Sequence, residues 1–79
     1  MAMDREAEVR RLNEGDIHIS DAERRVTEQS VIVERLHAEG GDAQEAERLL
    51  KNFRDVLGGL YGHRELIVDM IRRVDAGLV

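Results

Sequence analysis

The chain has 79 residues, of which 42% are hydrophobic and 37% charged, with no proline, cysteine or tryptophan. A chain of this length forms one small domain, and the absence of proline suits long, uninterrupted helices. Without cysteine it has no disulfide framework and no thiolate metal site, and a net charge of −5 argues against a nucleic-acid partner. No segment resembles a membrane span or a secretory signal, so we expect a cytoplasmic protein with no membrane partner.

The first predicted element is a helix over about residues 4–39. Its apolar residues recur at the two core positions of a coiled-coil heptad, which are Leu12, Ile19, Val26 and Val33 at one and Ala22 and Leu36 at the other. Gly15 lies inside this pattern, and Ser20 with Glu23 could cap a new helix start there. Leu12 and Ile19 keep their phase across Gly15, which favours one continuous helix.

Residues 40–42 predict a turn. The paired glycines supply the positive φ that ends many helices. Asp42 is then expected to cap the next helix. Glu45, three residues later, would complete a capping box.

The second predicted element is a helix over about residues 43–76. Its central apolar row is Ala46, Phe53, Leu60, Ile67 and Val74, flanked by Leu49, Val56 and Met70 on one side and by Leu50, Leu57, Ile71 and Leu78 on the other. Two long helices and a short turn predict an all-α fold, an antiparallel two-helix hairpin forming a single domain over residues 1–79. The apolar rows of the two helices face each other when a residue i of the first helix lies opposite about residue 82 − i of the second helix.

The apolar stripe of the second helix is wider than one partner helix can cover. We therefore predict that two hairpins pair into a homodimeric four-helix bundle. The predicted interface residues are Leu50, Phe53, Leu57, Leu60, Ile67 and Ile71. If the two hairpins pack antiparallel about a two-fold axis near the level of Arg24, Ile32 of one chain would lie near Ile17 and Leu66 of the other. The alternative is that a helix of another protein covers the same stripe.

The three histidines raise the question of a metal site. His18 and His63 fall at one level of the hairpin, and His63 is expected to be partly buried. A metal or anion site and a pH-sensitive contact are possible there, but a polar layer that fixes the register is favoured. Glu34 and His37 form a Glu-x-x-His pair, and a solvated pair beside the turn is favoured over a metal ligand. We expect no metal and no cofactor.

Other polar residues predict structural contacts and no chemistry. Gln29 and Ser30 are expected to form a further polar layer facing Phe53. Adjacent arginines alternate with acids at helical spacing, as in Asp21 with Arg25, which predicts solvated ion pairs. The other such pair is Asp69 with Arg73. No catalytic constellation and no phosphate-binding loop is present, so we do not expect an enzyme.

The pattern over residues 12–68 resembles a group of small uncharacterised proteins abundant in Bradyrhizobium-like alphaproteobacteria. The residues that carry the resemblance are His18-Ile19, Glu23-Arg24-Arg25-Val26, Gln29, Leu36, Gly41-Asp42, Ala46, Leu49-Leu50, Phe53, Leu57, His63-Arg64 and Ile67. The resemblance implies a bacterial, cytoplasmic helical hairpin and adds no activity and no site residue. The chain departs from the group at Gly58, Gly59 and Gly62, where better helix formers are expected.

The sequence thus predicts a small non-enzymatic module for protein–protein interaction or scaffolding that associates with itself. A regulator that captures a helix of a larger bacterial protein is the first alternative. The second is a metal-binding helical bundle that uses His18 and His63.

Overall fold

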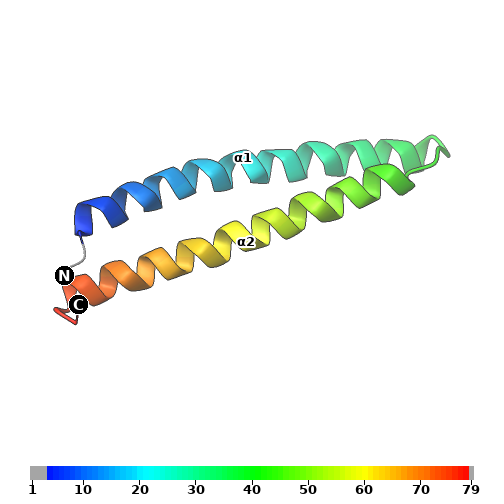
Figure 1. Cartoon of the computed structure of the whole chain (residues 1–79). Coiled ribbons are helices and arrows are strands. Elements are labelled where there is room, and N and C mark those ends of the chain that lie inside the picture. Colours follow the sequence, from blue (N-terminus) through cyan, green and yellow to red (C-terminus); the bar gives the residue numbers. More distant parts are fainter. Residues whose placement is uncertain (1–3, 79) are drawn as a thin grey trace.

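The computed structural model describes residues 4–78, which form two long antiparallel helices, α1 (Arg5–Ala38) and α2 (Gln44–Asp75). The start of α1 and the end of α2 lie at the same end of the hairpin, opposite the turn (Figure 1). Each helix begins and ends within one residue of the predicted boundary, and α1 runs unbroken through Gly15. The predicted all-α antiparallel hairpin is confirmed. Residues 1–3 and 79, at the ends of the predicted domain, lie outside the described residues.

The ends of α1 follow from local sequence. The Asp4 side chain accepts a hydrogen bond of 3.0 Å from the backbone N–H of Glu6, and so satisfies one of the free donors of the first turn. At the other end Gly40 adopts a φ of 71°, the left-handed conformation that glycine tolerates best. The backbone N–H of Gly41 then donates to the carbonyl of Leu36 at 2.8 Å. The chain thereby leaves α1 in the direction of α2.

The predicted capping box at the start of α2 is wrong. The N-cap is Ala43, one residue later than expected, and it makes no side-chain hydrogen bond to the helix. Asp42 accepts a 3.0 Å hydrogen bond from the backbone N–H of Gln44, while Glu45 pairs with Arg48 at 3.1 Å. The shift has a packing cause, because Ala43 is only 6% exposed and already belongs to the apolar contact between the helices.

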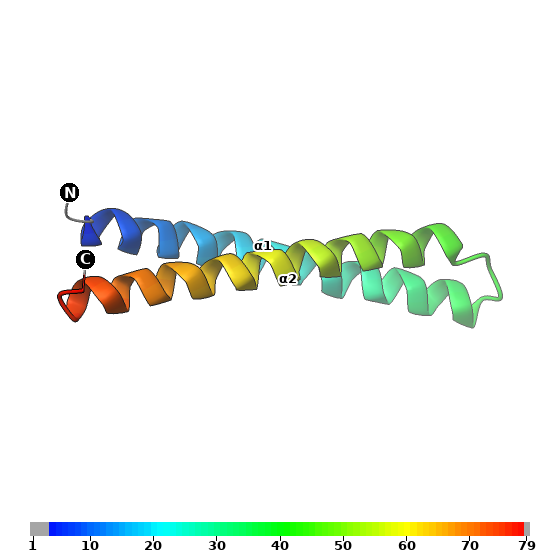
Figure 2. The same cartoon turned by 60° about the horizontal axis from the view of Figure 1, so that its bottom comes forward.

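The two helices meet along a seam, which we define as the positions in each helix that are spaced alternately three and four residues apart and are shielded from solvent. In α1 these are Glu8, Leu12, Gly15, Ile19, Ala22, Val26, Gln29, Val33 and Leu36, and in α2 Ala43, Ala46, Leu50, Phe53, Leu57, Leu60, Arg64, Ile67, Ile71 and Val74. This spacing is the heptad pattern of a two-stranded coiled coil. Figure 2 shows α2 crossing over α1 near the middle of the hairpin, as helices that wind around each other do.

The two apolar rows that flank the centre of α2 are not equivalent. The row with Leu50 and Leu57 belongs to the seam, whereas Leu49 and Val56 stay 42% and 58% exposed. His63 continues this exposed row, so the expectation that it is partly buried is wrong. Its neighbour Arg64 takes the seam position instead.

Side-chain hydrogen bonds join five residue pairs between the helices. One of them, Gln29 with the backbone carbonyl of Ala46, has residue numbers that total 75, and the other four agree with the predicted register. These join Arg5 to Asp75, Asp16 to Arg64, Glu23 to Tyr61 and His37 to Glu47. In each pair the two residue numbers total between 80 and 84, close to the predicted 82. The hairpin is therefore aligned along its whole length.

The hairpin is long and thin. It measures 58 × 15 × 15 Å and has a radius of gyration of 17.8 Å, against about 12 Å for a compact domain of this length. Among the described residues no side chain is less than 2% exposed. A single hairpin therefore has a seam but no enclosed core.

Candidate functional site

The contacts that join α1 to α2 gather on one side of the seam, which we call the polar face. Asp16, Glu23 and His37 are separated by multiples of seven residues along α1, as are Glu47, Tyr61 and Asp75 along α2. Residues at such spacing share one face of a coiled-coil helix. The polar face therefore carries four contacts that align the two helices.

Two of these contacts are charged hydrogen bonds with well-defined geometry. Arg5 Nε donates to Asp75 Oδ1 at 2.6 Å, and Arg64 Nε donates to Asp16 Oδ1 at 2.8 Å. The hydrogen bond from Arg5 lowers the pKa of Asp75, and the bond to Asp16 raises the pKa of Arg64. Both pairs are exposed to solvent, so they fix alignment more than they add stability.

The opposite side of the seam differs, and we call it the open face. It consists of two rows from each helix: Arg11, His18, Arg25 and Ile32 with Glu14, Asp21, Glu28 and Arg35 from α1, and Leu49, Val56, His63 and Met70 with Glu45, Asn52, Gly59, Leu66 and Arg73 from α2. Among residues 4–78, no side-chain hydrogen bond or ion pair joins the two helices here. The apolar side chains of this face lie beside the seam without a partner.

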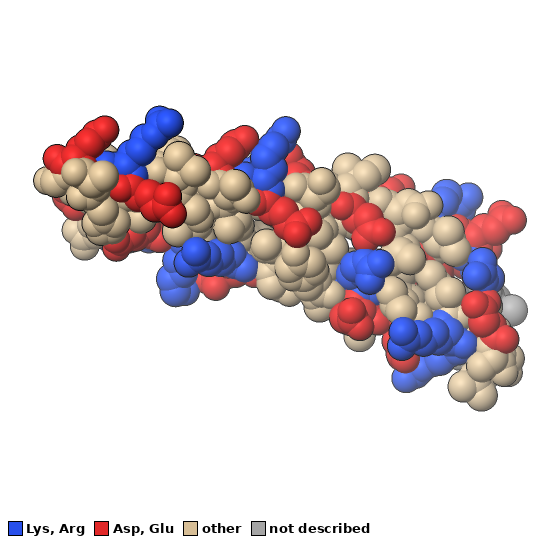
Figure 3. Space-filling model, turned by 180° about the vertical axis from the view of Figure 1, so that it is seen from behind, with Lys and Arg blue, Asp and Glu red and all other residues tan. Residues whose placement is uncertain are grey.

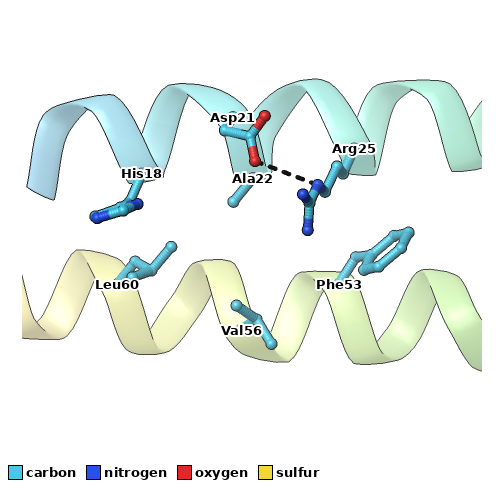
Figure 4. Close-up of a pocket in the computed structure, with 7 residues that line it drawn as sticks. All are labelled: His18, Asp21, Ala22, Arg25, Phe53, Val56 and Leu60. Atoms are coloured by element: carbon cyan, nitrogen blue, oxygen red, sulfur yellow. Dashed lines mark ion pairs between the residues drawn. The ribbon is translucent and has the colours of Figure 1, made fainter.

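A shallow groove runs along the open face. Its largest part, about 320 Å³, is lined by apolar and polar side chains of both helices. Figure 4 shows His18 and Ala22 of α1 opposite Phe53 and Leu60 of α2, with Val56 beside them. Two further depressions continue it toward the chain ends, because they share lining residues with it or with each other. The groove is open along its length and encloses no site for a small substrate.

The predicted interface residues occupy the seam. Leu50 and Ile67 are only 8% and 5% exposed and pack against α1 within a single hairpin. The other four, Phe53, Leu57, Leu60 and Ile71, are half-buried at seam positions. Phe53 and Leu60 also line the largest part of the groove, and Ile67 lines one of the depressions that continue it.

The apolar residues available to a partner form the next row outward. On α2 these are Leu49, Val56 and Leu66, with Leu66 66% exposed, and on α1 Ile32 is 45% exposed. Ile17 lies on the outer side of α1, away from the open face, as does Val31 fourteen residues later. Sequence periodicity carried no signal for this choice, because Leu49 and Val56 flank the central apolar row of α2 on one side just as Leu50 and Leu57 flank it on the other.

The histidines do not assemble a metal site in this hairpin. His18 and His63 line the same small depression, beside Arg11 and Arg64. This agrees with the prediction that the two histidines lie at one level of the hairpin. Within the described part of the chain, no three histidine, aspartate or glutamate side chains come close enough to hold a metal ion together. His37 contacts Glu47 across the turn.

Two buried polar residues lie in the seam. Gln29 is 7% exposed, and its Nε2 donates to the backbone carbonyl of Ala46 at 3.0 Å, which confirms it as a polar layer. Ser30 was expected in the same layer, but its hydroxyl donates to the backbone carbonyl of Val26 in its own helix at 2.8 Å. Glu8, 6% exposed, pairs with Arg11 at 2.8 Å, and the sequence pattern did not single it out.

The charged surface is evenly mixed. Seen from behind, acidic and basic side chains alternate along the molecule without a block of one sign (Figure 3). The predicted pairs of Asp21 with Arg25 and Asp69 with Arg73 are present at 3.2 and 3.0 Å. The face seen in Figure 3 shows no cluster of positive charge.

Comparison with known proteins gives no match: no protein-family model, no curated protein and no solved structure is similar to the chain. The resemblance to hairpin proteins of Bradyrhizobium-like bacteria stays a prediction. Within residues 4–78, neither helix has a stretch long and apolar enough to cross a membrane.

Proposed function

We propose that the chain is a small, non-enzymatic interaction module of the cytoplasm that pairs with a second copy of itself through the open face. The observation that carries the proposal is the contrast between the two faces. One is closed by four contacts between the helices, and the other exposes a row of apolar side chains beside a groove. Stacking two hairpins by their open faces forms a four-helix bundle with an enclosed core.

The exposed area supports the same proposal. The hairpin exposes 5926 Å², whereas a compact monomer of its 9.0 kDa mass exposes about 4,900 Å². The excess is roughly 1,000 Å² for each chain, close to the ~800 Å² that each partner contributes to a stable protein–protein interface. We expect a second copy that covers the open face to remove an area of this order.

A matched pair of substitutions tests the proposal. Val56→Glu places a charge on the open face, and Val31→Glu makes the same change at an exposed valine on the outer side of α1. Light scattering on a sizing column should give about 9.0 kDa for Val56→Glu and about twice that mass for Val31→Glu and the unmodified chain. Equal masses for the two variants would contradict the proposal. A monomeric unmodified chain would leave the face free for a helix of another protein.

A further inference from the structure

The open face of α2 has a symmetry along its length. Glu45 and Arg73 lie fourteen residues on either side of Gly59, and Leu49 and Met70 lie about ten on either side. A two-fold axis at Gly59, perpendicular to the helices, therefore brings opposite charges together at the ends. The same axis brings Leu49 and Met70 together between them, and sets Leu66 against Asn52.

Gly59 itself favours a close contact at this point. A glycine inside a helix weakens it relative to alanine. A side-chain carbon added at Gly59 would meet nothing within 4 Å, so packing inside one hairpin does not require a glycine. At the centre of two crossing helices, the missing side chain lets the two backbones approach closely.

We propose that the second copy binds antiparallel, with its turn at the opposite end, across a two-fold axis at Gly59. This inference rests on the proposed self-association and specifies its geometry. Leu49 of one chain then lies against Met70 of the partner subunit. Glu45 likewise lies near Arg73 of the partner subunit, on the rim of the interface.

The same axis determines the contacts of α1. Because residue i lies opposite about residue 82 − i, Gly59 is level with Glu23, and α1 packs on its copy about that level. Asp21 then approaches Arg25 of the partner subunit, which is favourable. Arg11 approaches Arg35 of the partner subunit, which is unfavourable.

The competing arrangement has both turns at the same end, so that α1 of one chain packs on α2 of the other. Arg35 would then lie near Glu45 of the partner subunit, a favourable pair. The two arrangements therefore predict opposite effects for a charge reversal at Arg35.

Sedimentation equilibrium on Arg35→Glu provides this test. The antiparallel dimer gains an Arg11–Glu pair twice, so its dissociation constant should fall by about threefold or more. Arg54→Glu, on the polar face, changes the net charge equally and should leave the constant unaltered. A weaker Arg35→Glu dimer would overturn the antiparallel arrangement.

Cysteine cross-linking tests the axis directly, because the chain has no cysteine of its own. Gly59→Cys should form a disulfide-linked dimer about tenfold or more faster than Gly62→Cys on the outer side of α2, since pairing raises the effective thiol concentration. An equal mixture of Leu49→Cys and Met70→Cys should cross-link, and a mixture of Leu49→Cys and Ile32→Cys should not.

If Leu49→Cys cross-links with Ile32→Cys and not with Met70→Cys, while the mass in solution is doubled, the antiparallel arrangement is overturned. Self-association is then still supported. A mass of 9.0 kDa for the unmodified chain would instead overturn the proposed function. The two failures are thereby distinguished.

Discussion

Gln29 is a buried amide at a seam position where leucine would bury more apolar surface. Its hydrogen bond to the carbonyl of Ala46 ties the last third of α1 to the first turn of α2. Polar groups at such positions fix register in coiled coils at some cost in stability. Gln29 therefore explains why the hairpin holds one alignment although most of its seam is aliphatic.

Two substitutions test whether Gln29 fixes the register at a cost in stability. Gln29→Ala should lower the free energy of unfolding by about 1–2 kcal/mol, because it removes a buried hydrogen bond and leaves space in the seam. Gln29→Leu should be at least as stable as the unmodified chain, since the carbonyl of Ala46 keeps its bond within α2. Urea unfolding measures both, and equal losses for the two variants would contradict this role.

Tyr61 is the chain's only tyrosine, and its hydroxyl donates to Glu23 Oε2 at 2.8 Å. This hydrogen bond raises the pKa of Tyr61 above its ordinary value of 10.0, because only the protonated phenol can donate. The stabilisation is therefore fully present below pH 10 and is lost as the pH rises through the raised pKa.

Ultraviolet titration of the phenol measures this shift without interference, since the chain has no tryptophan. Glu23→Ala should return the pKa of Tyr61 toward its ordinary value. Identical titration curves for the two proteins would show that the contact does not form in solution.

At the scale of the helices, heptad spacing predicted both helices and their register, and the paired glycines predicted the turn. The apolar residues of α1 fall almost wholly on one seam, so the phase of that helix is unambiguous. In α2 three adjacent rows are apolar, and the sequence alone did not show which two face α1. Arg64 takes a seam position and bonds to Asp16, whereas His63 lies in the exposed row beside the groove. A sequence pattern based on apolar residues alone does not reveal such a contact.

Glycines inside the helices offer a second test at this scale. Gly15→Ala and Gly62→Ala should each raise the free energy of unfolding by about 0.5–1 kcal/mol, because alanine favours helix more than glycine does. In both places an added methyl group meets nothing within 4 Å. Thermal unfolding at a fixed chain concentration measures the gain. A lower melting temperature for Gly15→Ala would show that the seam has no room there.

The whole molecule is a hairpin with one closed side and one open side. The polar face aligns the helices and leaves few apolar groups uncovered, whereas the open face leaves Leu49, Val56 and Leu66 exposed beside a groove. Sequence analysis predicted that a second copy is needed but placed the interface on seam residues. Periodicity alone did not show which residues a single hairpin already buries.

Small-angle X-ray scattering of the unmodified chain tests the central claim, because one experiment gives both mass and length. Two hairpins stacked by their open faces should show about twice 9.0 kDa with a maximum dimension close to the 58 Å of one hairpin. A mass of 9.0 kDa at every concentration would contradict the account. So would a doubled mass with a maximum dimension approaching twice that length, since the open faces would then not be stacked.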